Sequence, residues 1–153
     1  LKGTKSPEIS IKGKSLKIAI ILPYFNEELG SELLKNIKEE LLKNKVGKNN
    51  IKIHRVSGAL ELPFAAMKIS ENGKTDCIIA LGIIIKGDTD HYDYVCKTTY
   101  NGLMQVQLIK KVPIIFGILT CANVKQAKVR VTKSGLNKGK EIAIAALLQT
   151  QIT

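Results

Sequence analysis

Apolar and polar positions follow two different spacings along this chain, and these predict strands and helices in turn. Four short apolar runs, rich in β-branched residues, are typical of buried strands and cover residues 16–24, 51–56, 76–85 and 113–119. Apolar residues at helical spacing indicate helices at 26–44, 61–71, 90–110, 124–131 and 137–150. Strands and helices that alternate in this order form a mostly parallel sheet. The expected fold is an α/β three-layer sandwich, with helices on both faces of a four-stranded sheet.

The chain has 153 residues, which is the usual length of one domain with a substantial core. Residues 16–153 carry the predicted elements and are expected to form this single domain. Residues 1–15 are polar and rich in lysine, and we expect an N-terminal extension there. Its stretch 9–11 could form an extra strand, but a lone strand needs a partner.

The net charge of +11 raises the question of nucleic-acid binding. The lysines are dispersed along the sequence, aromatic residues make up only 5% of it, and no aromatic residue is interleaved with a basic cluster. A single-strand binding surface needs such interleaving, because bases stack on aromatic rings. We therefore expect no nucleic-acid partner. A basic RNA-binding domain is the alternative, and it would need a clustered basic stripe.

Cysteine usage and hydropathy bear on the compartment. Cys77, Cys96 and Cys121 are an odd number and lack the spacing of metal ligands, so we expect reduced thiols in or near the core. No apolar run approaches the length of a membrane span, and no signal peptide is evident. These features favour a cytoplasmic protein with no membrane partner.

The third predicted strand leads into a turn that suits an anion. The turn comprises residues 86–90, and its Asp and Thr side chains can cap the following helix. Free backbone N–H groups at a helix N-terminus bind phosphate well, and Lys86 adds a positive charge. His91 follows in the first helical turn, and histidine exchanges protons near neutral pH. The pattern predicts a phosphate cradle beside a proton carrier; an ordinary strand–helix turn with a solvated histidine is the alternative.

The other three strands also end in suggestive residues. The first is followed by Phe25 and Asn26, the second leads to Glu61, and the fourth contains Phe116 near its predicted end. The carboxyl ends of parallel strands lie along one edge of a sheet, so these residues could converge. An aromatic ring there could stack on a flat heterocycle, while a carboxylate and an amide could hydrogen-bond a polyol. Packing in the core is the alternative for either phenylalanine.

Five motifs occur in order along the chain. They are Tyr24-Phe25-Asn26, Gly58-Ala59-Leu60-Glu61-Leu62-Pro63, Lys86-Gly87-Asp88-Thr89-Asp90-His91-Tyr92, Phe116-Gly117-Ile118-Leu119-Thr120 and Asn137-Lys138-Gly139. Together they resemble the lumazine synthase family, over residues 16–149. Five ordered motifs are far more specific than any one of them. The resemblance implies a flavodoxin-like fold.

The resemblance also implies an activity. In that family, a ribitylamino-pyrimidinedione with a free amine condenses with dihydroxybutanone 4-phosphate, and phosphate and water leave. The product is 6,7-dimethyl-8-ribityllumazine, formed in the penultimate step of riboflavin biosynthesis. No metal or organic cofactor takes part. Two alternatives share the resemblance, namely an archaeal-type riboflavin synthase and a non-catalytic flavin- or lumazine-binding paralogue.

Site roles follow from the same resemblance. His91 is the expected proton shuttle. The residues expected at the pyrimidine ring and the ribityl chain are Phe25, Asn26, Ala59, Leu60, Glu61, Ile84, Ile85, Phe116 and Lys138. The residues expected at the phosphate are Lys86, Gly87, Asp88, Thr89 and Arg130. Phe116 and Arg130 would come from the adjacent subunit.

Such a shared site requires a homo-oligomer. The family builds pentameric rings, and some members assemble sixty subunits into a hollow shell. We expect a pentamer here and leave the shell open. In the family, the N-terminal segment pairs with a neighbour's sheet, which would give the stretch 9–11 its partner.

Overall fold

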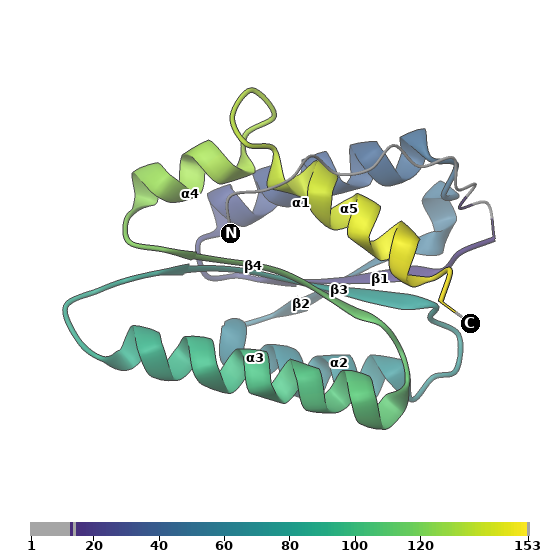
Figure 1. The fold of residues 1–153 in the computed structure, drawn as a ribbon, viewed down its shortest axis with the longest axis horizontal. Coiled ribbons are helices and arrows are strands. Elements are labelled where there is room, and N and C mark those ends of the chain that lie inside the picture. The colour runs from purple at the N-terminus through teal and green to yellow at the C-terminus, as the bar shows by residue number, and fades with distance from the viewer. Residues whose placement is uncertain (1–12, 14, 153) are drawn as a thin grey trace.

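The computed structural model describes residues 13 and 15–152. At its centre is a four-stranded sheet with the order β2-β1-β3-β4, and every neighbouring pair of strands is parallel (Figure 1). The strands are β1 (Ile18–Pro23), β2 (Ile51–Val56), β3 (Cys77–Ile85) and β4 (Ile114–Cys121). The order of the strands reverses between β1 and β3, and ligands bind at such a switch point in open α/β sheets.

Helices cover both faces of the sheet, as Figure 1 shows. The helices are α1 (Glu27–Lys43), α2 (Leu62–Ser70), α3 (His91–Lys110), α4 (Val124–Val131) and α5 (Lys138–Gln149). The layer on one face contains α1, α4 and α5, and the layer on the other contains α2 and α3. Two short 3-10 turns, Lys48–Asn50 and Ala59–Glu61, precede β2 and α2.

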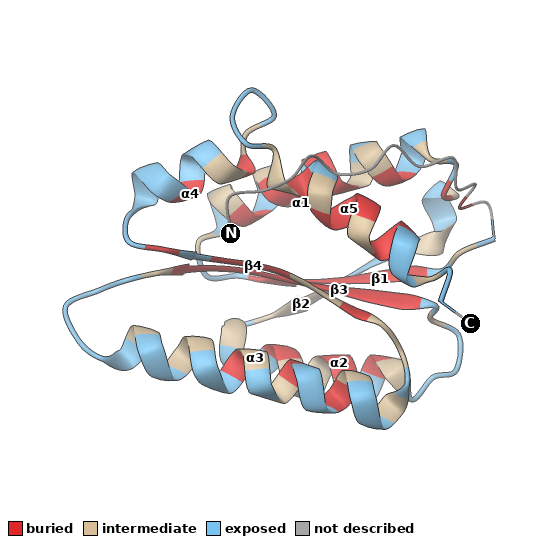
Figure 2. Ribbon diagram, in the orientation of Figure 1, coloured by how far each residue is buried: buried red, intermediate tan, exposed pale blue. Residues whose placement is uncertain are grey.

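Two hydrophobic clusters form the core, one on each side of the sheet. Alternate residues of β1 divide between them: Ile18 and Ile20 face α1 and α5, whereas Ala19 and Ile21 face α2 and α3. Figure 2 shows burial along the sheet and on the inner sides of the helices, with exposed outer sides. A sheet that is covered on both faces explains why β1 and β3 are nearly continuous apolar runs.

The layer of α1, α4 and α5 is tied together at the middle of α1. Asn36 is buried, and its side-chain amide donates a hydrogen bond of 2.7 Å to the carbonyl oxygen of Val131 at the end of α4. A Cβ atom on Gly139 would lie 2.7 Å from the Cβ of Asn36 and 3.0 Å from the backbone nitrogen of Ile37. Only glycine allows α5 to approach α1 this closely, so one buried side chain of α1 contacts both neighbouring helices.

The predicted α/β sandwich is confirmed, and its sheet is fully parallel. β4 extends to Cys121 rather than ending at residue 119, because its pairing with β3 continues to the pair Ile85–Cys121. Phe116 consequently pairs with Ala80 within β4 and does not lie at its carboxyl end. The predicted strand at 9–11 lies outside the described residues. Among the described helices, none is long and apolar enough to cross a membrane.

Candidate active site

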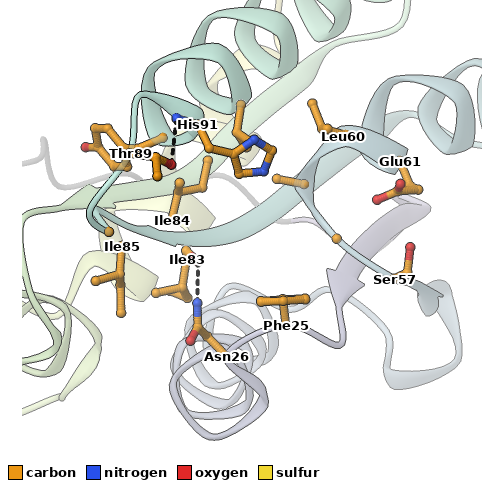
Figure 3. A pocket seen from close by; sticks show the side chains of 15 residues that line it. Phe25, Asn26, Ser57, Leu60, Glu61, Ile83, Ile84, Ile85, Thr89 and His91 are labelled. Carbon is orange, nitrogen blue, oxygen red and sulfur yellow. Dashed lines mark hydrogen bonds between the residues drawn. The ribbon is translucent and has the colours of Figure 1, made fainter.

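A pocket of about 520 Å³ lies beyond the carboxyl ends of β1 and β3, at the switch point of the sheet (Figure 3). It is lined by Phe25, Asn26, Ser57, Gly58, Ala59, Leu60, Glu61, Ile83, Ile84, Ile85, Gly87, Thr89, His91, Tyr92 and Val95. Figure 3 shows Phe25 and His91 on two sides of the pocket, with Ile83, Ile84 and Ile85 at one end and Glu61 at the other. The pocket therefore joins three strand–helix connections that are far apart in sequence.

The connection between β1 and α1 contributes Phe25 and Asn26. Asn26 adopts a left-handed backbone conformation with φ of 56°, which asparagine tolerates better than most residues. Its side-chain amide donates a hydrogen bond of 2.7 Å to the carbonyl oxygen of Ile83. The Phe25 side chain beside it is exposed, with 75% of its surface accessible to solvent. An exposed phenyl ring at the mouth of a pocket is suited to stacking on a flat ligand.

The connection between β2 and α2 contributes a carboxylate. The 3-10 turn Ala59–Glu61 follows Gly58, whose backbone is extended. A Cβ atom on Gly58 would lie 3.2 Å from Oε2 of Glu61, so the carboxylate packs close over the glycine. Glu61 remains exposed to solvent and can accept hydrogen bonds from ligand hydroxyl groups.

The connection between β3 and α3 contributes the proposed anion site. The Thr89 hydroxyl oxygen accepts a hydrogen bond of 3.3 Å from the backbone N–H of His91. Asp90 occupies the capping position of α3 without a side-chain cap bond, so Thr89 provides the cap that the sequence led us to expect in this turn. Among the residues that the structure describes, and apart from the two chain neighbours of Gly87, no heavy atom lies within 4 Å of a Cβ atom built on this glycine. This glycine leaves open space in front of the helix N-terminus.

His91 is the first residue of α3, is exposed, and lines the pocket. Tyr92 and Val95 line it from the same helix. Burial raises the pKa of the Tyr92 hydroxyl, and the Thr120 side chain offsets part of this shift. Tyr92 therefore stays neutral at physiological pH, and its hydroxyl can act as a hydrogen-bond donor to Thr120 or to a ligand.

Five residues that the resemblance assigns to the site do not line this pocket: Lys86, Asp88, Phe116, Arg130 and Lys138. Lys86 and Asp88 lie in the exposed turn before α3. The ring of Phe116 packs against Tyr100 at a centroid distance of 5.5 Å. Arg130 donates a hydrogen bond of 3.0 Å to the carbonyl oxygen of Gln126, and Lys138 forms an ion pair of 2.6 Å with Glu141.

The pocket also contains residues that the motifs did not lead us to assign: Ser57, Gly58, Ile83, Tyr92 and Val95. Helical spacing could have identified Val95, because it lies one turn after His91 on the same face of α3. Ile83 shares a face of β3 with Ile85, at the spacing of two that strands impose. Among the described residues, no cluster of three or more His, Cys, Asp and Glu side chains could hold a metal ion.

The fold and the pocket define an α/β protein that binds its ligand at the carboxyl edge of a parallel sheet, between an exposed phenyl ring and a helix N-terminus. Residues 15–152 match the family model of 6,7-dimethyl-8-ribityllumazine synthase. The chain belongs to this family of enzymes, and its membership supports the lumazine synthase reaction of riboflavin biosynthesis. The family is known to form oligomers.

Proposed function

We propose that this pocket condenses 5-amino-6-ribitylamino-pyrimidinedione with dihydroxybutanone 4-phosphate. The observation that carries the proposal is the convergence of Phe25, Glu61 and His91, from three different connections, around one cavity of about 520 Å³. A cavity of this size can hold a small organic ligand. A stacking ring, a polyol acceptor and a proton carrier are the groups that these two substrates require.

The pyrimidine ring is proposed to stack on Phe25, with backbone groups of Ile84 and Ile85 at its edge. The ribityl chain then extends along the connection between β2 and α2. The residues proposed to hold it are Asn26, Ala59, Leu60 and Glu61, all of which line the pocket. Glu61 is the natural acceptor for hydroxyl groups, because an ionised carboxylate offers several acceptor sites.

The phosphate is proposed to bind at the N-terminus of α3. Backbone N–H groups of Gly87, Asp88 and Thr89 face an anion there, and the Thr89 hydroxyl and the Lys86 charge add to the attraction. The open space around Gly87 supports this placement, because the backbone of the turn is accessible to a ligand. The Asp88 carboxylate has to point away from the phosphate, which leaves only its N–H for binding.

His91 is proposed to move protons between the substrates. The free amine of the pyrimidine attacks the ketone of the four-carbon phosphate, and a water molecule leaves as the imine forms. Elimination of phosphate and closure of the second ring follow, and both need further proton transfers. The His91 side chain lines the pocket two residues after Thr89, which supports a place beside both the amine of the pyrimidine and the phosphate end of the four-carbon substrate.

A neighbouring subunit is proposed to complete the site with Phe116 and Arg130, and Lys138 is proposed to lie beside the pyrimidine. The subunits would form a pentameric ring. The outer sides of α2 and α3 support association, because they expose large apolar side chains: Phe64, Tyr94, Leu108 and Ile109. We further propose that the reaction takes place in the cytoplasm, in line with three cysteines that are all free.

A direct assay tests the proposed function. The purified protein is incubated with both substrates, and the fluorescent lumazine product is identified by its emission and its mass. Formation of dimethyl-ribityllumazine well above the rate without protein is the expected result. Riboflavin as the product, or binding of lumazine without turnover, would contradict the proposal.

A further inference from the structure

Arg55 lies on β2, at the edge of the sheet, and its guanidinium group contacts the connection between β1 and α1 at three points. Its Nε donates a hydrogen bond of 3.0 Å to the carbonyl oxygen of Leu22. Its Nη2 lies 2.5 Å from Oε2 of Glu27, the first residue of α1. Its central carbon lies 4.0 Å from the centroid of the Tyr24 ring. The guanidinium group thus contacts Leu22 at the end of β1, Glu27 at the start of α1 and the Tyr24 ring between them.

The segment between these contacts carries Phe25 and Asn26. Two backbone hydrogen bonds hold its first part to the end of β2: Tyr24 N–H to Val56 at 2.8 Å, and Phe25 N–H to Ser57 at 3.3 Å. The left-handed conformation of Asn26 costs free energy, so it needs support from its surroundings. Because the Phe25 ring is itself exposed, its direction depends on the backbone that Arg55 supports.

Only arginine provides these three contacts together. The guanidinium group is planar, always charged and able to donate several hydrogen bonds in its plane while its face stacks on an aromatic ring. Lysine could keep the ion pair with Glu27, but all its donors are on one nitrogen atom, so it has no second nitrogen for Leu22 and no flat face for Tyr24. About a quarter of the Arg55 side chain is accessible to solvent, at 28%, so water competes only partly for these contacts.

From this geometry we infer that Arg55 is a positioning residue that fixes the Phe25 ring as the platform for the aromatic substrate. Arg55 does not line the pocket, so it acts through the connection that it holds. The inference rests on the proposed function, since it takes Phe25 as the stacking residue for the pyrimidine. It predicts a selective effect. Loss of the three Arg55 contacts weakens binding of the ribitylamino-pyrimidinedione and leaves binding of the four-carbon phosphate at the N-terminus of α3 unchanged.

The test compares Arg55→Met, Arg55→Lys and Phe25→Ala with the wild-type protein. We expect Arg55→Met to raise KM for the ribitylamino-pyrimidinedione by about tenfold, below the roughly hundredfold loss that a 1 Å misplacement can cause. KM for dihydroxybutanone 4-phosphate should stay within twofold, and Arg55→Lys should recover only part of the loss. The Kd of dimethyl-ribityllumazine, measured by fluorescence, should rise in parallel with the first KM. Glu71→Gln, which removes a carboxylate from exposed ion pairs with Lys68 and Lys110, is the matched control.

Amide hydrogen exchange in the segment 24–27 reports how Arg55 stabilises the backbone, separately from how the Phe25 ring binds the substrate. Arg55→Met should speed exchange there, while exchange in β3 stays unchanged. If Phe25→Ala binds lumazine like the wild type, the proposed role of Phe25 is wrong, whatever Arg55 does. If Phe25→Ala weakens binding but Arg55→Met changes neither KM nor exchange in 24–27, the inference about Arg55 is overturned. Should Arg55→Met not fold, Glu27→Ala removes one of the three contacts, and the same two measurements decide.

Discussion

The side-chain amide of Asn26 donates a hydrogen bond to the carbonyl oxygen of Ile83 at a distance of 2.7 Å, and so joins the ends of β1 and β3. These two strands are the neighbours between which the order of the sheet reverses. The bond therefore spans the base of the pocket, and it also holds a residue whose backbone is left-handed. Asn26 thus makes the hydrogen bond to Ile83 and also adopts the left-handed backbone conformation. Substitutions can separate the contributions of these two features to stability.

Asn26→Ala should destabilise the protein by about 2 kcal/mol, because it loses the hydrogen bond and places an ordinary side chain in the left-handed region. Asn26→Gly loses the same bond but accepts the backbone conformation, so it should cost about half as much. Urea denaturation of both variants measures the difference. Equal losses in the two variants would show that the left-handed backbone at position 26 does not disfavour alanine relative to glycine.

His91→Ala should lower kcat by roughly 10²- to 10⁴-fold, as for general acid–base groups, or by somewhat less. The substrates also react slowly without protein, so activity should not vanish. His54 on β2 is the second of the two histidines in the chain and does not line the pocket, which makes His54→Ala the matched control. Steady-state kinetics of the two variants decides the matter; wild-type turnover in His91→Ala would exclude the residue from proton transfer.

Inorganic phosphate should inhibit competitively against dihydroxybutanone 4-phosphate, because both occupy the turn before α3. Thr89→Val and Arg130→Ala should each raise the inhibition constant about tenfold, since each removes a hydrogen bond to a charged group. Lys125→Ala on α4 removes a nearby charge outside the proposed site and serves as the control. An inhibition constant that neither Thr89→Val nor Arg130→Ala changes would place the phosphate elsewhere.

Two impaired variants, His91→Ala and Arg130→Ala, should complement each other when their subunits are mixed in one ring. Some interfaces then pair an intact His91 with an intact Arg130 from the next subunit, while others carry both lesions, so recovery is partial. Rings with cyclic symmetry have heterologous interfaces, which is the geometry that allows this pattern.

The two variants must be unfolded and refolded together, and mass spectrometry must confirm mixed rings. Each variant refolded alone gives the baseline. Activity in the mixture no greater than the sum of the two baselines would mean that each site is formed within one chain.

Stability should fall steeply above pH 9, because burial raises the pKa of the Cys77 thiol from 9.0 to about 12. The unfolded thiol loses its proton first, so the folded state binds more protons between these two values. The stabilisation is complete below pH 9 and decreases by about 1.4 kcal/mol per pH unit above it. Urea denaturation at pH 8, 9 and 10 gives the free energy of unfolding as a function of pH. Above pH 9 it should decrease less steeply in Cys77→Ala than in the wild type. Equal dependence on pH in the two proteins would refute the assignment.

The sequence predicted the fold because β3, the strand with the clearest pattern, is a run of nine residues with eight buried. Such a run of buried β-branched residues strongly favours a central strand. The other predicted strands alternate with amphipathic helices along the chain. The end of β4 was less predictable, since pairing with β3, and not local composition, extends β4 to Cys121. That difference places Phe116 well before the carboxyl end of β4, where it pairs with Ala80, rather than near the predicted end of the strand.

Pocket residues next to a turn were predictable from their chemistry, as for Glu61, Thr89 and His91. Arg55 was not, because its significance depends on Leu22 and Glu27, which lie 33 and 28 positions away in sequence. Local sequence contains no signal for such contacts. Tertiary packing alone brings them together.

The buried contact between Asn36 and Val131 links the two ends of the proposed shared site through a single helix. α1 starts directly after Asn26, which lines the pocket of the same chain. About 15 Å further along α1, Asn36 donates its hydrogen bond to Val131, the residue next to Arg130. In a closed ring, each α1 would thus connect the pocket of its own chain to the Arg130 segment that enters the pocket of the next chain. A displacement of α1 at one pocket would therefore also displace the Arg130 segment at the next pocket.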